Sequence, residues 1–457
     1  MTTDYPDDLK YHQLEKLKIQ SDKLMFGMYV CELDRPWSEA PFNFQGFMLQ
    51  DVDDIAEIRK HCEFVYIDVR KSIHGKAGAS SALTNSPGTQ VPINPSRSSL
   101  IEAPPGSSSK TGVYEGLSAH ISAHIHTGKT DTPQEENTDF LRSLATSLKN
   151  REKTSNLVKS IMDDIRLGKS IDTPAAKEAV AACVDNVMMN KDANLLLTRL
   201  RNKDEYTSEH SLNVAIISIA FGRHMGMSRK ELNVLGLCGL LHDMGKMLTP
   251  TEILNKPGKL TDEEMAIMKH HPLDGREILL GSDSVMDVVI DTAYGHHERL
   301  RGQGYPRGVR ATEIPLYTRM VTIADVFDAI TGDRVYRQGE TAETALSFLH
   351  QGAGSAFDES LVMQFIQNIG TYPLGSIVEM DNGEVGIVVD NNPTHRLRPK
   401  IKLLLDHNKT ALNPHTIDLA THPKDIAGIP YRIKTSHRLG SFGINLAEHI
   451  ESYVKRK

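Results

Sequence analysis

The stretch GLLHDMGK, residues 239–246, places a histidine and an aspartate side by side in an apolar segment with helical patterning. A carboxylate on a buried helix face is costly unless it is paired, hydrogen-bonded or bound to a metal. On a helix, His242 and Asp243 would point roughly 100° apart. This arrangement suits a histidine that binds one ion beside a carboxylate that bridges to a second. The segment therefore predicts a helical fold built around a metal centre.

Other histidines and acidic residues lie in the same helical region, between residues 206 and 325 or just beyond. They are His210 in YTSEHSLNV, His270 and His271 in MKHHPLDG, His296 and His297 in HHERLRGQGYP, and Asp325 and Asp328 in IADVFDA. Only one residue of the pair before Pro272 needs to be a ligand, and we choose His271. A lone histidine in a helix is usually an ordinary core or surface residue, but the coincidence of so many in one region favours a shared site.

The residue types indicate which metals this site would hold. Imidazole and carboxylate ligands suit first-row transition metals such as Fe, Mn or Zn better than Mg or Ca. A two-metal centre holds its ions about 3.5–4 Å apart, can generate a bridging hydroxide and clamps a phosphate oxygen. Two divalent ions with two aspartates keep a net positive charge, which attack on a phosphodiester requires. Two divalent transition-metal ions, with Fe or Mn favoured, are therefore expected.

The overall composition is that of a soluble globular protein of two or three domains, with 457 residues, 39% hydrophobic and 24% charged. The net charge of −7 argues against a partner that is a nucleic-acid polymer, because such binders carry a basic footprint. The four cysteines are far apart and form no CxxC pair, which fits a reducing cytosol. No signal peptide is apparent, and apolar runs are shorter than the roughly 20 residues that membrane insertion needs. A cytoplasmic protein is expected.

Patterning along the chain predicts a multidomain protein with a mainly α catalytic bundle. Residues 1–75 are expected to form a small β-rich N-terminal domain, with strands in FGMYVCEL and FVYIDV, and residues 76–136 a flexible Ser/Pro/Gly-rich linker. Residues 137–372 are expected to form the helical domain, with its core motifs in 195–370. Residues 373–457 are expected to form a β-rich C-terminal extension.

Local signals add detail to this division. Asp172 or Thr173 would cap a helix that has Pro174 just inside it. Asn382-Gly383 indicates a hairpin turn, and KIKLLLD adds a further strand. Apolar spacing predicts a helix over 137–170 with a polar break around 151–155. The pattern leaves open whether this helix packs on its own domain or pairs in a homodimer that relays a signal from the N-terminal domain.

Residues of roughly 195–370 resemble the HD-GYP family of the HD-domain phosphohydrolase superfamily. The motifs are HDMGK, ILNKPGKLTDEE, HHP, HHERLRGQGYPRG, IADVFDAITGDRVYR and the later FD at 357–358. The N-terminal segment is similar to the small β domain often found ahead of HD-GYP. The resemblance implies a metal-dependent phosphodiesterase that hydrolyses cyclic di-GMP to pGpG and GMP, lowering this second messenger in bacterial control of biofilm and motility.

The resemblance also implies a ligand set. One ion would be bound by His210, His242, Asp243 and Asp325, and the other by His271, His296 and His297, with Asp243 bridging. Some members bind a third metal through a glutamate four residues before the first histidine. That position is Tyr206 here, with Glu205 one place off, so a dinuclear site is favoured.

Family analogy assigns phosphate contacts to Lys246, Arg334 and Arg337, since the arginines can bind oxygens in a fork. Asp328, one turn after Asp325, would orient Arg334 or a metal ligand. The expected reaction is in-line attack by the bridging hydroxide, with Asp243 and Lys246 as catalytic residues. Either a metal-bound water or Lys246 could protonate the leaving oxygen.

Gly304, Tyr305 and Pro306 form the GYP loop, which would turn tightly beside the histidine pair. Its role is open between a structural one and one in binding substrate or a partner. In the family this loop is linked to contact with GGDEF-type cyclases. Two rival functions also stay open: a non-catalytic cyclic di-GMP receptor or scaffold, and an HD phosphohydrolase for another cyclic or simple nucleotide.

Overall fold

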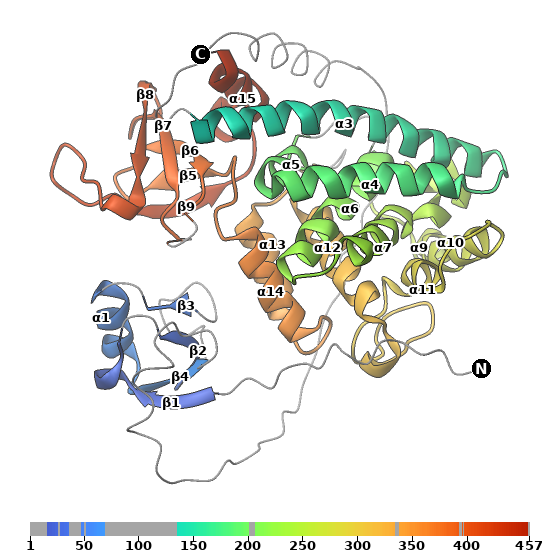
Figure 1. Cartoon of the computed structure of the whole chain (residues 1–457), viewed down its shortest axis with the longest axis horizontal. Coiled ribbons are helices and arrows are strands. Elements are labelled where there is room, and N and C mark those ends of the chain that lie inside the picture. The colour runs from blue at the N-terminus through green and yellow to red at the C-terminus, as the bar shows by residue number, and fades with distance from the viewer. Residues whose placement is uncertain are drawn as a thin grey trace. The chain divides into compact units, whose positions relative to one another are not determined.

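The computed structural model describes residues 16–25, 28–35, 47–49, 52–68, 135–200, 206–333, 338–392, 395 and 397–455 (Figure 1). The described residues belong to two compact units that divide between residues 94 and 95, and each unit is described by itself. The predicted linker falls almost entirely outside the described residues. Among the described helices, none is both long and apolar enough to cross a membrane.

The N-terminal unit is a small antiparallel sheet with one helix. Its elements are β1 (Lys16–Gln20), η1 (Ser21–Lys23), β2 (Tyr29–Leu33), β3 (Phe47–Met48), α1 (Val52–His61) and β4 (Phe64–Asp68). The strand order is β1-β4-β2-β3. Val30 and Val65 on the strands pack against Ile58 of α1 in one buried cluster. The two predicted strands are confirmed as β2 and β4, while α1 was not predicted.

The second unit is mainly helical. Its helices are α3 (Glu135–Arg166), α4 (Thr173–Met189), α5 (Lys191–Leu197), α6 (Tyr206–His224), α7 (Arg229–Leu241), α8 (Thr251–Leu254), α9 (Asp262–Met268), α10 (His271–Leu280), α11 (Asp287–Gly295), α12 (Leu316–Thr331), α13 (Ala342–Gln351) and α14 (Glu359–Ile369). This unit also contains two short 3-10 helices between its α-helices, η5 (Met244–Leu248) and η6 (Ala311–Glu313). The predicted cap is confirmed, because the Asp172 carboxylate accepts from Ala175 N at 2.9 Å.

Helix α3 is continuous, which confirms the helix predicted over 137–170, and the polar stretch at residues 151–155 does not interrupt it. Figure 1 shows α3 as a long helix lying along α4. Leu144, Leu148 and Val158 are buried on one face, and Arg151 and Ser155 are buried among them. The polar residues keep the helix intact because they find partners on α6, as described below. These contacts support the interpretation that the helix packs on its own domain; a homodimer stays a prediction.

The C-terminal part is a five-stranded antiparallel sheet with one helix. Its elements are β5 (Ile377–Met380), β6 (Val385–Asp390), β7 (Lys400–Leu405), β8 (Ala411–Asp418), η7 (Leu419–Thr421), β9 (Ile433–His437), η8 (Ser441–Gly443) and α15 (Leu446–Lys455). The strand order is β8-β7-β6-β5-β9. The predicted hairpin is confirmed between β5 and β6, where Gly383 has a φ of 86° that favours glycine. Strands β8 and β9 and helix α15 were not predicted.

The C-terminal sheet shares one hydrophobic core with the helices. Leu144 of α3 and Leu197 of α5 belong to the same buried cluster as Val378 of β5 and Leu403 of β7. Ile450 of α15 completes the cluster from the end of the chain. The apolar face of the sheet is therefore covered by helices that come more than 170 residues earlier in the sequence.

Candidate metal centre

The histidine–aspartate pair lies where a helix ends. Helix α7 stops at Leu241, His242 is its C-cap, and Asp243 leaves the helix with φ −106° and ψ 12°. The expectation that both residues lie on a helix face is therefore wrong. The chain turns here into η5, where Gly245 packs directly on α10: a Cβ at Gly245 would lie 1.9 Å from the carbonyl oxygen of His271.

The carboxylate of Asp243 lies between two groups of imidazoles. Its Oδ1 is 3.3 Å from His271 Nε2 and 3.4 Å from His296 Nε2. Its Oδ2 is 3.4 Å from His242 Nε2 and 3.6 Å from His210 Nε2. The two oxygens thus face opposite groups, which is the arrangement that a bridging carboxylate needs.

Seven side chains form two clusters. Within each cluster, the possible ligand atoms all lie within 4.8 Å of one another. One cluster is Asp243, His271, His296 and His297, and the other is His210, His242 and Asp325. Two ligands of one first-row ion lie at most about 4.4 Å apart, since each bond is about 2.0–2.2 Å. The structure therefore brings together all seven residues that the sequence proposed as ligands. His270 is different: it is exposed, and its Nδ1 lies 2.8 Å from Asp274.

A repeated hydrogen bond orients the imidazoles. Three histidines donate Nδ1–H to the backbone carbonyl three residues earlier: His242 to Gly239 at 2.8 Å, His271 to Met268 at 2.7 Å, and His296 to Ala293 at 2.9 Å. His210 instead donates Nδ1–H to the carboxylate of Asp328 at 2.8 Å, and its Nε2 is 3.1 Å from Asp325. With Nδ1 protonated, each Nε2 lone pair is aimed into the site, as in metal-binding histidines.

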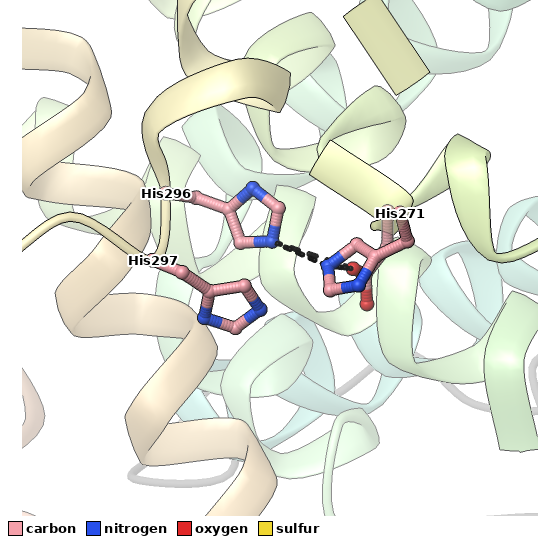
Figure 2. Close-up of side chains that lie close together, drawn as sticks. His271, His296 and His297 are labelled. Atoms are coloured by element: carbon pink, nitrogen blue, oxygen red, sulfur yellow. Dashed lines mark hydrogen bonds and ion pairs between the residues drawn. The ribbon is translucent and has the colours of Figure 1, made fainter. Parts of the chain in front are cut away.

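Figure 2 shows the side chains of His271, His296 and His297 converging on one region. The Nε2 atoms of His271 and His296 are 3.2 Å apart. Both rings donate their Nδ1–H to backbone carbonyl groups, so the two Nε2 atoms carry no hydrogen and both are acceptors. Two acceptor lone pairs at this distance repel each other unless a cation lies between them or beside them.

Burial keeps the histidine pair neutral. It lowers the pKa of His296 to about 4 and holds the pKa of His297 well below its usual range, and the neighbouring imidazoles add to the effect on His297. Neutral imidazole is the form that binds metals. At neutral pH neither residue needs to lose a proton before it can act as a ligand.

The two aspartates are held in the ionised form. Burial alone would raise the pKa of Asp243, but the charge of Lys246 and the nearby imidazoles of His242 and His271 hold that pKa well below its usual range. For Asp325, burial likewise opposes ionisation, but the hydrogen bond with His210 and the nearby imidazoles of His242 and His210 together outweigh burial and lower the pKa. The site therefore offers two carboxylates to a cation.

Two buried atoms test whether these residues fit a metal. Among the described residues, neither His242 Nε2 nor Asp243 Oδ1 has a hydrogen-bond partner. Buried polar atoms without a partner are costly and need an explanation. Coordination to a cation would satisfy both, and the set of imidazole and carboxylate donors suits a divalent transition metal. The residues present fit two such ions.

Lys246 is the predicted phosphate-binding residue that the structure describes. It lies three residues after Asp243, and side chains three residues apart lie on the same side of a 3-10 helix. Its Nζ donates a hydrogen bond to Asp243 Oδ2 at 2.6 Å. Arg334 and Arg337 lie outside the described residues. Sequence reasoning missed Arg299, which lies two residues after the histidine pair. Its guanidinium interacts electrostatically with Asp325 and lies 5.3 Å from the centre of the Phe357 ring.

The GYP loop packs on the histidine pair. A Cβ at Gly304 would lie 2.4 Å from the Cα of Glu298 and 2.5 Å from the carbonyl oxygen of His297, so only glycine fits. Tyr305 stacks on His297, with ring centroids 4.6 Å apart and the planes inclined by 24°. Pro306 follows a cis peptide bond. Among the roles left open for Tyr305, this contact supports a structural one.

Glu298 is a second residue that sequence reasoning missed. It is buried, and its carboxylate accepts from Arg307 N at 2.8 Å and from Val309 N at 3.1 Å. These bonds close the loop that carries Tyr305. The signal was present in the sequence, because a carboxylate that directly follows a buried histidine pair needs partners.

Three family models match the chain in succession. The HD domain matches residues 194–361, the domain of unknown function DUF3391 matches 16–176, and the KOW domain associated with HD domain matches 377–425. The HD-domain match contains all seven clustered side chains. The KOW match begins at the first strand of the C-terminal sheet.

Several curated relatives are similar to this chain. A cyclic di-GMP phosphodiesterase of Pseudomonas aeruginosa is 32% identical over 407 residues, which are 88% of this chain and 88% of that protein. The cyclic di-GMP phosphodiesterase response regulator RpfG of Xanthomonas campestris is 39% identical over 36% of this chain and 45% of its own length. The 3'3'-cGAMP-specific phosphodiesterase 1 of Vibrio cholerae is 35% identical over 41% of this chain and 43% of its own length. The near full-length match, together with the HD domain and its histidine–aspartate clusters, shows that the chain belongs to the HD-GYP family of the HD-domain phosphohydrolase superfamily.

Proposed function

We propose that the protein is a metal-dependent phosphodiesterase that hydrolyses cyclic di-GMP to pGpG and GMP, and so lowers this second messenger in bacterial signalling. One observation carries the proposal: the two carboxylate oxygens of Asp243 face two separate groups of imidazoles. The near full-length relative that is named a cyclic di-GMP phosphodiesterase supports the choice of substrate.

We assign the seven clustered side chains to two ions. His210, His242 and Asp325 would hold one, His271, His296 and His297 the other, and Asp243 would bridge them. The donor set suits Fe, Mn or Zn, and of these we propose Fe or Mn. When bound, such ions polarise a phosphate oxygen and lower the pKa of a coordinated water so that it can attack near neutral pH.

The charges of the site suit an anionic substrate. When bound to metal, the imidazoles would be neutral ligands. The two carboxylates would then neutralise only two of the four positive charges of two divalent ions. The remaining positive charge lies in a buried region, where electrostatic attraction is stronger than in water. A phosphodiester group would be drawn to it.

Lys246 would act on the substrate once Asp243 is bound to metal. Its Nζ now donates to Asp243 Oδ2, the oxygen that the ions would engage, and its side chain is 23% exposed. Coordination would release the ammonium group to donate to a non-bridging phosphate oxygen, or to protonate the leaving 3′-oxygen. Arg334 and Arg337 remain predicted phosphate contacts, and a fork of donors at these positions would serve the second phosphate.

The decisive experiment is metal analysis of anaerobically purified protein, followed by hydrolysis assays on cyclic di-GMP and on 3'3'-cGAMP with separation of pGpG from GMP. We expect about two ions per chain and turnover of cyclic di-GMP. Bound metal without turnover would support the receptor alternative. Preferential turnover of 3'3'-cGAMP would move the protein to the other substrate class, to which one relative belongs by name.

Adjacent histidines provide a matched pair of variants. His271 is buried in a cluster, whereas His270 is exposed and bonds to Asp274. His271→Ala should lose one ion and most activity, while His270→Ala should keep both. If His271→Ala retained two ions and the activity of the parent, our assignment of the second cluster would be wrong.

Two further parts of the proposal concern partners and place of action. Pro306 and Arg307 are exposed on the GYP loop and would be available to a GGDEF-type cyclase. Co-purification with such a cyclase should weaken when Arg307 is replaced by Glu, and it should not change if the loop is only structural. We also propose a cytoplasmic site of action, which cell fractionation tests, and a homodimer, which light scattering tests.

A further inference from the structure

A buried polar cluster connects α3 to the first turns of α6. Arg151 of α3 donates through Nη2 to Glu209 Oε2, and the same nitrogen is 2.7 Å from Asn213 Oδ1. Ser155, one turn later on α3, donates to Glu209 Oε1 at 3.1 Å. Asn213 in turn donates to the carbonyl of Thr198 at 3.2 Å. Both oxygens of Glu209 are therefore bonded by α3.

This cluster lies next to a proposed metal ligand. Glu209 directly precedes His210, so the two side chains leave α6 about 100° apart. Glu209 faces α3, whereas His210 faces Asp328 and Asp325 of α12. A rotation or shift of α6 that moves Glu209 must also move His210.

An ion pair is an unusual way to fill this position. Arg151 is 3% exposed and Glu209 is 2% exposed. Apolar residues of the same size would pack there at no loss of stability or with a gain, because a buried ion pair loses its hydration. What an ion pair adds is direction: its hydrogen bonds fix the register of two helices, which apolar contacts do only loosely.

We propose that Arg151 is a positioning residue that acts through Glu209 to set the place of His210, and thereby controls occupancy of the ion held by His210, His242 and Asp325. The inference rests on the proposed metal centre. By this inference, α3 sets the affinity for one of the two ions. It is the first described element of this unit. A displacement of α3 along its axis would lower the affinity of the site for that ion and leave the other ion bound.

The test is a Mn²⁺ titration of chelator-treated full-length protein, read as the number of ions bound and the dissociation constant of each. The double variant Arg151→Met, Glu209→Met removes the directional bonds and keeps the volume, so it should fold; thermal melting without metal checks this. Lys153→Ala is the matched control, because Lys153 lies on the exposed side of α3 with Glu178 3.6 Å away.

We expect the double variant to bind one Mn²⁺ as the parent does and the other about tenfold more weakly, the low end of losses seen when a residue behind a ligand is removed. Saturating Mn²⁺ should restore most of kcat. Unchanged binding of both ions would overturn the inference, and so would equal weakening of both ions or loss of folding, since these mark a purely structural pair. A parent protein that binds neither Mn²⁺ nor, under anaerobic conditions, Fe²⁺ would refute the metal centre itself and this inference with it.

Discussion

Replacing Gly245 by alanine should open the metal centre without changing the side chain of any proposed ligand. The added methyl carbon would come 1.9 Å from the carbonyl oxygen of His271 and 2.4 Å from the backbone nitrogen of Gly275. Cβ contacts below 3.0 Å are essentially never seen, so η5 and the start of α10 must separate by roughly 1 Å (3.0 minus 1.9). Both contacts are to backbone, so no side chain can rotate away to relieve them.

The expected loss follows from this separation. His271 begins α10 and would move away from Asp243, whose Oδ1 is now 3.3 Å from its Nε2. A misplacement of 1 Å in a catalytic site costs about 10²-fold in rate, or about 3 kcal/mol of barrier. Overpacking of a tight core should lower the free energy of unfolding by about 1–3 kcal/mol. Metal content should fall from about two ions towards one.

The assay combines metal analysis, cyclic di-GMP hydrolysis and thermal melting of the Gly245→Ala variant. Gly281→Ala is a control at the other end of the same helix α10, where a Cβ would meet its nearest atom, the carbonyl oxygen of Glu277, at 3.5 Å. We expect the control to match the parent in metal and rate. Two bound ions with parental kcat in Gly245→Ala would refute the argument that this close approach sets the position of His271.

Three more predictions follow from neighbours of the ligands. Asp328→Asn removes the carboxylate that accepts from His210 at 2.8 Å, so Mn²⁺ affinity should fall about 10–100-fold, and unchanged affinity would contradict this role. Tyr305→Ala should weaken metal binding because it removes the ring stacked on His297, whereas Tyr305→Phe should not; equal behaviour of the two variants would exclude stacking as the cause. In metal-free protein, His296 has a pKa of about 4, below its unfolded value near 6.5, so only the unfolded state takes up a proton between these pH values. The contribution of His296 to the free energy of unfolding should therefore fall by about 3 kcal/mol as pH drops from 6.5 to 4, and a His296→Gln variant should lose this contribution in urea titrations while that of His297 remains.

The sequence predicted which side chains gather better than it predicted the backbone that holds them. The seven candidates were found because acids and imidazoles in apolar helical segments are costly unless something binds them, and this argument needs no geometry. Its geometric extension failed at Asp243, which was expected on a helix face and lies after the helix end. Just after this point Gly245 packs against α10, a tertiary contact that local periodicity does not encode.

The polar residues of α3 show the same limit from the other side. Arg151 and Ser155 interrupt the apolar stripe of the predicted helix, and the sequence does not say whether they are exposed or buried. In the structure they are buried because Glu209, 58 positions after Arg151, supplies their partner. A polar residue on an apolar face can mean exposure or a buried pair, and only the fold decides. The stacking of Tyr305 on His297 likewise depends on how the loop folds back.

The core shared by the C-terminal sheet and the early helices has a consequence for genetics. A nonsense change shortly after codon 372 would leave every proposed ligand in the translated chain, yet it would strip the cover from Leu144 of α3 and Leu197 of α5. Such an allele should behave as a null through misfolding and proteolysis, and loss of function mapped to the codons for residues 373–457 would say nothing about chemistry.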